Sequence, residues 1–204
     1  YLDSLNWSKP WSSGAQFSGL CVFLETQYKS TDDYELVKSE LIKFSDKLLD
    51  SETGCYFRGD KVSDTELING AMKILTGLDW LGAEVHKPEA IIDTCLRIKP
   101  LGLGCDIVDI VYILYMCTKA TNYRKKDILC FIEDIESLIF KHYYPEIGGF
   151  SYYPENSQKY YYGLNITKGF KTPDIHGTTL LLWAFSMINC IKDTEETKLN
   201  LIKP

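Results

Sequence analysis

The helical segments of this sequence alternate between two kinds, and this alternation limits the possible folds more than any other feature. Four segments are apolar on nearly all sides, whereas the segments between them carry one apolar stripe and one polar face. A helix that is apolar all round needs burial on every side, and an amphipathic helix keeps one face in water. The alternation therefore predicts an all-α fold in which stacked helical hairpins form an inner and an outer layer.

Apolar spacing, capping residues and turn residues place these segments along the chain. The apolar helices are expected over residues 13–24, 65–82, 105–118 and 173–188, and the amphipathic helices over 31–49, 88–98, 127–143 and after Asp193. Long loops are expected over residues 51–64 and 145–172, where glycine, proline and tyrosine gather. The segment 105–118 is rich enough in β-branched residues for a buried strand, but its length favours a helix.

Composition describes an ordinary globular chain. Its 204 residues fit one domain over residues 1–204, and 45% hydrophobic with 25% charged residues is typical of soluble proteins. The net charge of −6 argues against a nucleic-acid surface, and the longest apolar run is too short to cross a bilayer. We therefore expect a small molecule or a protein as partner, with no nucleic acid and no membrane. Because the sequence opens at Tyr1 without a methionine, this domain is also compatible with a longer parent protein.

The seven cysteines are scattered, and no two of them form a Cys-x-x-Cys pair. This spacing does not match a zinc ribbon or a thioredoxin-type site. Free thiols in a reducing compartment explain the pattern, so we expect a cytoplasmic protein without a cofactor.

Two loops resemble one another. Residues 50–57, before the third helix, and residues 144–152, before the seventh, each read as an acid, then glycine, then aromatic residues. The similarity indicates an internal repeat.

The stretch GGFSYYPENSQ, over residues 148–158, and the stretch PDIHGTTLLLWAFS, over residues 173–186, resemble one known group of proteins. This group is the α/α-toroid superfamily, which includes protein prenyltransferase β-subunits, terpenoid cyclases and sugar-processing α/α barrels. In prenyltransferases a Gly-Gly loop precedes an acid, a zinc-binding histidine, a threonine and an inner helix. The resemblance implies a toroid-like partial barrel, with His176 at the position of the zinc-binding histidine.

Three departures from the prenyltransferase and cyclase patterns matter. The chain offers fewer helical hairpins than a full prenyltransferase barrel, so the ring would be shorter or open. The Asp-x-Cys zinc pair is missing, because Cys105 and Asp106 have the right types in the wrong order. The acidic motif of class II cyclases is absent too, and Asp106 with Asp109 does not replace it.

If the inner helices point the same way, their first turns gather at one end of the bundle and form a pocket there. The polar residues in these first turns are the candidate site. They divide into possible catalytic residues, His176, Asp106 and Asp109, and possible ligand-binding residues, Gln16, Asn69, Asp174, Thr178, Tyr152 and Tyr161.

Two interpretations of His176 remain open. As a functional residue it would be a general acid or base, or a metal ligand, with an aspartate as its partner. As a structural residue it would, with Asp174, cap the helix that comes next. A zinc site made of Cys105, Asp106 and His176 would need a fourth ligand or a bound water.

The two aspartates of the fifth helix lie one turn apart and share a face. Buried carboxylates are costly without partners, so we expect Asp106 and Asp109 to be exposed at the pocket end, either as a paired acid and base that line the pocket or as ordinary caps of the helix start. The tyrosines between Phe150 and Tyr162 suggest a lid over the site, with flat rings that suit sugars or a partner protein. His86 and His142 lie beside expected turns, so we expect both of them in solvent.

The leading hypothesis is a pocket that binds a polar, carbohydrate-like small molecule, with or without catalysis by His176. The second is a non-catalytic module that binds a protein or peptide through its tyrosine-rich loop and concave inner face. The third is a prenyl- or terpenoid-processing enzyme, which would need an aromatic-walled apolar cavity.

Overall fold

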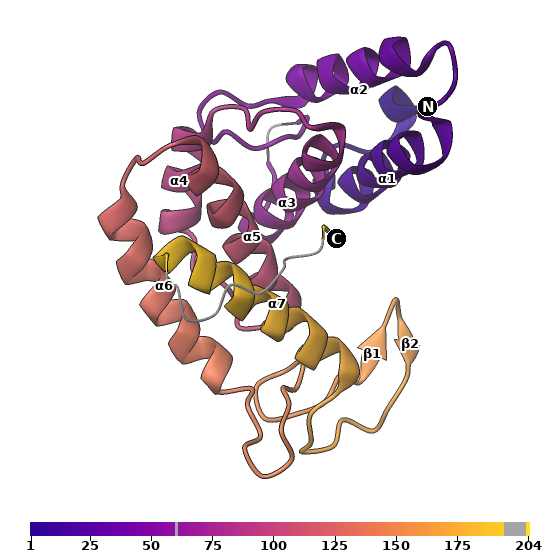
Figure 1. Cartoon of the computed structure of the whole chain (residues 1–204). Helices are drawn as coiled ribbons and strands as arrows, with labels where there is room; N and C mark the ends of the chain where they lie inside the picture. Colours follow the sequence, from indigo (N-terminus) through magenta and orange to yellow (C-terminus); the bar gives the residue numbers. More distant parts are fainter. Residues whose placement is uncertain (60, 194–202) are drawn as a thin grey trace. The chain divides into compact units, whose positions relative to one another are not determined.

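A computed structural model describes residues 1–59, 61–193 and 203–204, and it confirms the all-α class (Figure 1). Over these residues the chain forms α-helices, a 3₁₀-helix (Leu2–Ser4), a π-helical segment (Leu24–Tyr28) and a single two-stranded hairpin. The elements are α1 (Pro10–Phe23), α2 (Tyr34–Leu48), α3 (Asp64–Leu81), α4 (Pro88–Arg97), α5 (Gly104–Ala120), α6 (Lys125–Phe140), β1 (Tyr160–Tyr161), β2 (Leu164–Asn165) and α7 (Ile175–Lys192). The polar helix expected after Asp193 falls on residues 194–202, outside the described part of the chain.

The chain divides into two compact units. The first contains Tyr1–Ile98 and Met116–Tyr123 together with Lys203 and Pro204, and the second contains Lys99–Tyr115 and residues 124–193. Helix α5, which length favoured over a strand, is confirmed as a helix and contributes residues to both units.

In the first unit α1 packs along α3, and glycines bring the two helices close together. A Cβ atom on Gly70 would lie 2.6 Å from Pro10, and one on Gly77 would lie 2.7 Å from Phe17. Helix α1 begins at Pro10, earlier than the start expected at residue 13. Proline is favoured in the first turn, and the Glu66 carboxylate accepts a hydrogen bond from the Trp11 amide at 2.9 Å.

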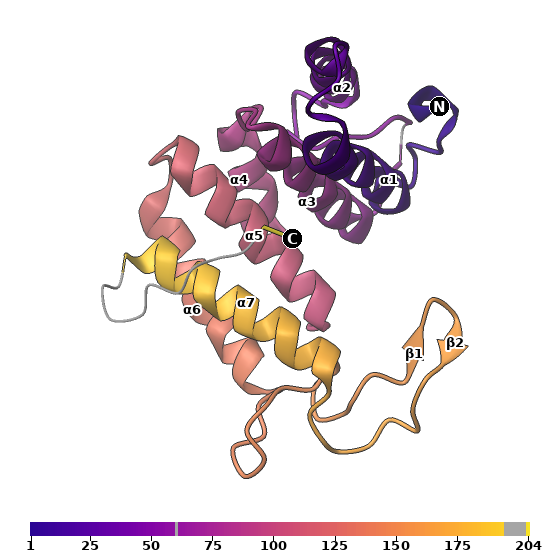
Figure 2. The ribbon, with the colours of Figure 1, turned by 45° about the vertical axis from the view of Figure 1, so that its right-hand side comes forward.

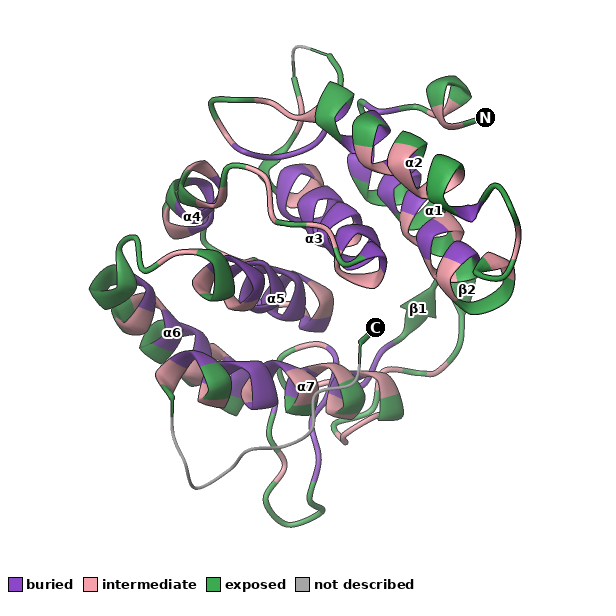
Figure 3. Cartoon of the chain, turned by 45° about the horizontal axis from the view of Figure 1, so that its top comes forward, coloured by how far each residue is buried: buried purple, intermediate pink, exposed green. Residues whose placement is uncertain are grey.

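Burial follows the expected alternation only in part. Helices α3 and α5 are buried along most of their length, as the apolar pattern predicts (Figure 3). Helices α1 and α7 were expected to be buried on all sides, and that expectation is wrong, because Phe23 and Leu182 among others are exposed.

In the second unit α6 and α7 lie side by side (Figure 2), and their aromatic side chains meet. The rings of Phe140 and Phe185 pack edge to face with centroids 5.5 Å apart. Helix α5 contributes Tyr112, whose ring centroid lies 5.4 Å from that of Trp183 on α7. Three helices therefore share an apolar core behind the start of α7.

The internal repeat is confirmed at its turns, which we call the first glycine turn (residues 48–57) and the second glycine turn (residues 142–151). Both close with the same set of backbone hydrogen bonds, and a glycine with positive φ, Gly54 or Gly148, lies at the same place in each. The antiparallel bridge between Leu49 and Tyr56 in the first turn corresponds to the one between Tyr143 and Phe150 in the second. Two sequence segments thus form the same local structure.

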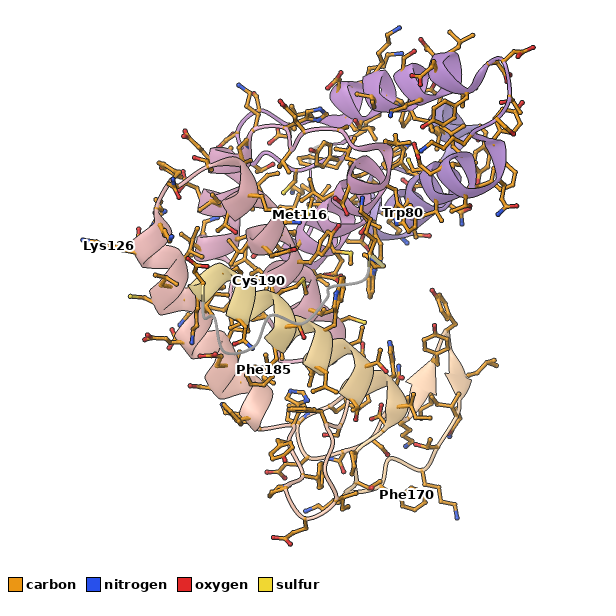
Figure 4. The ribbon with its side chains drawn as sticks, viewed as in Figure 1. Trp80, Met116, Lys126, Phe170, Phe185 and Cys190 are labelled. Carbon is orange, nitrogen blue, oxygen red and sulfur yellow. The ribbon has the colours of Figure 1, made fainter. Side chains whose placement is uncertain are left out.

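The two glycine turns differ in how the chain continues from them. The first leads almost directly to α3, whereas the second continues through an inserted segment, residues 152–174, before α7 begins. Within this segment β1 and β2 pair around Tyr162 and Gly163, whose φ angles of 47° and 79° are those of a type I′ turn. Figure 4 labels Phe170 on the outer arm of this segment and Phe185 on α7. The segment expected as a plain loop therefore contains a hairpin.

Candidate functional site at the start of helix α7

Asp174 connects the inserted segment to the start of α7. Its Oδ1 accepts a hydrogen bond from the Gly177 amide at 2.7 Å, which caps the helix. Its Oδ2 accepts two more, from the Tyr152 amide at 2.8 Å and the Gln158 amide at 2.9 Å. The predicted capping role is thus present, and the same carboxylate fixes two points of the preceding loop.

Thr178 and Gly177 fasten the second glycine turn to α7. The Thr178 hydroxyl accepts a hydrogen bond from the Phe150 amide at 2.9 Å and donates one to the Phe150 carbonyl at 3.0 Å. Gly177 lies so close to the turn that an added Cβ would be 2.4 Å from backbone atoms of Ser151 and Tyr152. The hydroxyl that the sequence suggested for ligand binding therefore holds the turn in place.

His176 is held between two tyrosines and a glutamine. Its ring stacks on Tyr152 at 5.0 Å between centroids, and the ring of Tyr161 is perpendicular to it with centroids 5.7 Å apart. Its Nδ1 lies 2.7 Å from Oε1 of Gln158. An amide oxygen only accepts, so the proton lies on Nδ1 and Nε2 carries a lone pair.

The electrostatics of His176 favour this neutral form. Burial lowers the pKa of its imidazole, and the nearby Asp174 carboxylate offsets that effect in part. Among the residues that the structure describes, none forms a hydrogen bond with Nε2. The ring is therefore oriented by the protein and presents an unused acceptor.

Tyr152 connects His176 to the start of α5. Its carbonyl accepts a hydrogen bond from the Gly104 amide at 3.0 Å, and its hydroxyl is hydrogen-bonded to Cys105. Burial, this bond and the charge of Asp106 all raise the pKa of the Tyr152 phenol, so the hydroxyl stays protonated. Tyr152, whose ring stacks on His176, is thus held by hydrogen bonds at its backbone carbonyl and at its hydroxyl.

The two aspartates of α5 are buried, which corrects the expectation that they lie exposed at a pocket end. Asp106 is 8% exposed and Asp109 is 4% exposed. The aspartate partner suggested for His176 is replaced at Nδ1 by Gln158. Asp106 and Asp109 are thus buried residues of α5. The His176 imidazole is oriented by the side-chain amide of Gln158.

Gln16 and Asn69 belong to the first unit. Gln16 is exposed and accepts a hydrogen bond from the Tyr1 hydroxyl at 2.9 Å. Asn69 is buried, and its side-chain amide has no hydrogen-bond partner among the described residues. Of the expected site residues, His176, Asp174, Thr178, Tyr152 and Tyr161 are brought together within the second unit.

A second histidine, His142, lies in the second glycine turn and is buried at 1% exposure, which corrects the expectation that it lies in solvent. Its Nδ1 lies 2.8 Å from the Ser151 carbonyl, to which it donates a hydrogen bond. The first glycine turn has Leu48 at the same place. The position that is leucine in the first glycine turn is thus His142 in the second. Burial lowers the pKa of the His142 imidazole.

This lowered pKa predicts that stability declines in mild acid. In the unfolded chain the histidine titrates near 6.5, and in the folded protein it titrates lower. Between the two pKa values the unfolded state binds a proton that the folded state excludes. The free energy of unfolding should therefore decrease as pH falls below 6.5, by at most about 1.4 kcal/mol per pH unit from this group, and level off below the folded pKa.

Urea unfolding of the wild type and of His142→Leu, from about pH 7.5 to about pH 5, measures this effect. The wild type should lose more stability over that range than the variant, which carries the residue of the first turn. Equal slopes for the two proteins would contradict the assignment to His142.

Sequence reasoning missed Gln158 as a site residue. It is the last residue of the stretch GGFSYYPENSQ, and neither its spacing nor its neighbours mark it out. Its 6% exposure and its bond to His176 arise because the inserted segment folds back over α7. No local signal could have found it.

Comparisons with known proteins supply no evidence about this site. No family model, no curated protein and no solved structure matches this chain. Over the described residues, no group of three or more His, Cys, Asp or Glu side chains could hold a metal ion. In that same part of the chain, no helix is long and apolar enough to cross a membrane.

Proposed function

We propose that the second unit binds a polar, carbohydrate-like small molecule at the start of α7. The observation that supports this most directly is the unused Nε2 of His176, held in place by Gln158 and Tyr152. A fixed neutral imidazole accepts a hydrogen bond from a ligand hydroxyl, and a sugar presents several such donors.

The neighbouring tyrosines supply the second element of sugar recognition. Tyr161 is 47% exposed, and its ring is perpendicular to that of His176 with centroids 5.7 Å apart, so it is available to a ligand at this site. Flat aromatic rings stack on the apolar faces of sugars, and the phenol hydroxyl adds a hydrogen bond. If the bound molecule reacts, His176 is the residue in reach of it with a free lone pair, and its role would be that of a general base.

His176→Ala tests the proposal. Loss of the acceptor and of the ring that faces Tyr161 should weaken binding of a responding saccharide about tenfold or more. Isothermal titration calorimetry against neutral and anionic oligosaccharides measures this, and circular dichroism checks that the fold is retained. His86→Ala is the matched control, because His86 lies in the first unit beside Asp46. Unchanged saccharide binding by His176→Ala would refute the proposed binding site.

The exposed hairpin favours a second candidate function, in which the module binds a protein or peptide. Tyr162 and Leu164 are among its most exposed apolar side chains. In that case replacing both with serine should abolish capture of the partner, while His176→Ala should leave it unchanged.

The proposed architecture is an open α/α-toroid-like arrangement of helical hairpins. The repeated glycine turns support it, because each connects an amphipathic helix (α2 or α6) to a following helix rich in apolar residues (α3 or α7). An experimental structure in which the first turns of α1, α3, α5 and α7 do not face a common space would refute this arrangement.

A further inference from the structure

The segment that builds the site has an unusual charge. The inserted segment, residues 152–174, contains Lys159, Lys168 and Lys171 against Glu155 and Asp174, a net charge of +1, although the whole chain has a net charge of −6. Among the described residues none of these three lysines forms an ion pair, and Lys159 lies over the Tyr160 ring at 5.3 Å. Their charges are therefore available to a ligand.

The folding of the segment brings two of these lysines next to Gln158. Lys159 follows Gln158 directly, and Lys168 follows Thr167, whose hydroxyl donates a hydrogen bond to the Gln158 carbonyl at 2.7 Å. The two sides of the hairpin are also joined where the Ser157 amide donates a hydrogen bond to the Phe170 carbonyl at 2.8 Å. The backbone of two of the three lysines thus lies next to the residue that orients His176.

The acid nearest to His176 is Asp174, a single carboxylate against the three lysines of the segment. Both carboxylate oxygens of Asp174 already accept backbone hydrogen bonds, three in all, from Gly177, Tyr152 and Gln158. Amide donors of this kind favour the charged form of a carboxylate.

We propose that the ligand of the α7 site is an anionic saccharide, one that carries a carboxylate or phosphate group beside its hydroxyls. This inference rests on the proposed function and adds the charge of the ligand to it. The hydroxyls meet Nε2 of His176 and the ring of Tyr161, and the lysines attract the anionic group. A uronate and a sugar phosphate share this chemistry, and separate arms of the test distinguish them.

The test compares ligands matched in size. Oligogalacturonate and glucose 6-phosphate are titrated beside the neutral saccharides maltotriose and glucose, at low and at high salt. At least one anionic saccharide should bind about tenfold more tightly than its neutral counterpart, and the difference should shrink at high salt because exposed charges are screened. Whether the uronate or the phosphate binds more tightly identifies the anionic group.

Two triple variants test whether the lysines of the inserted segment bind the anionic group. Lys159→Gln with Lys168→Gln and Lys171→Gln should weaken binding of the anionic saccharide about tenfold, since each exposed charge contributes a few-fold. Lys125→Gln with Lys126→Gln and Lys141→Gln is the control, because it removes the same charge from exposed positions of α6 and its end. The control should bind as the wild type does.

Three results would overturn the inference, and they can be told apart. Equal affinity for neutral and anionic saccharides, with loss in His176→Ala, would leave the proposed function standing and remove only the charge preference. Inorganic phosphate or acetate binding as tightly as the saccharides would show a general anion site. No binding of any saccharide would remove the proposed function as well.

Discussion

Gly177→Ala should destabilise this protein by about 3 kcal/mol or more, which is a large part of the stability of an ordinary domain. The added Cβ would lie 2.4 Å from the Ser151 carbonyl carbon and from the Tyr152 amide nitrogen, and 2.8 Å from the Ser151 carbonyl oxygen. These are backbone atoms, which cannot turn away as a side chain does. The second glycine turn would have to move off α7, and Tyr152 would move with it.

Gly19→Ala is the matched control for this change. Gly19 also lies within a helix, but a Cβ there would meet nothing within 4 Å. Alanine is the better helix former, so this variant should gain about 0.5–1 kcal/mol. Urea unfolding of the two variants beside the wild type measures both effects. A loss below about 1 kcal/mol for Gly177→Ala would mean that the turn is not packed against α7 as the structure has it.

Asp174→Ala should have the second-largest effect, a loss of about 3 kcal/mol in the free energy of unfolding. It removes the cap of α7, worth about 1 kcal/mol, and leaves the Tyr152 and Gln158 amides without an acceptor. Both of these residues are buried, so each amide without its acceptor costs about 1 kcal/mol or more. The inserted segment should loosen, and the orientation of His176 should be lost with it.

Two further variants separate the cap from the loop contacts. Ser63→Ala removes a cap that accepts a single hydrogen bond, from the Glu66 amide at 3.3 Å, so it should cost about 1 kcal/mol. Asp174→Asn keeps one acceptor oxygen and should fall between Ser63→Ala and Asp174→Ala. If Asp174→Ala costs no more than Ser63→Ala, the carboxylate is only a cap. Thermal unfolding gives the order, and saccharide titration shows whether binding is lost with it.

The sequence by itself determined the features that depend on near neighbours. The apolar and amphipathic patterns predicted the helices, because a helix face is set by residues three and four positions apart. Capping by Asp174 was one of the expected roles for the same reason, since a cap bonds an amide two or three residues ahead. The two glycine turns were also visible, because Gly54 and Gly148 allow the same positive φ in two similar loops.

Only the tertiary structure decided what the inserted segment does. The bond between Gln158 and His176 joins residues far apart in sequence, and it depends on the two loop amides that Asp174 holds. The burial of His142, Asp106 and Asp109 also ran against expectation from residue type, because packing of the turn and of α5 outweighed polarity. A polar side chain is placed by the partners that the fold brings to it, and those partners come from distant parts of the chain. Sequence thus located the start of α7 as the candidate site, and the path of the loop around it supplied the residue that orients His176.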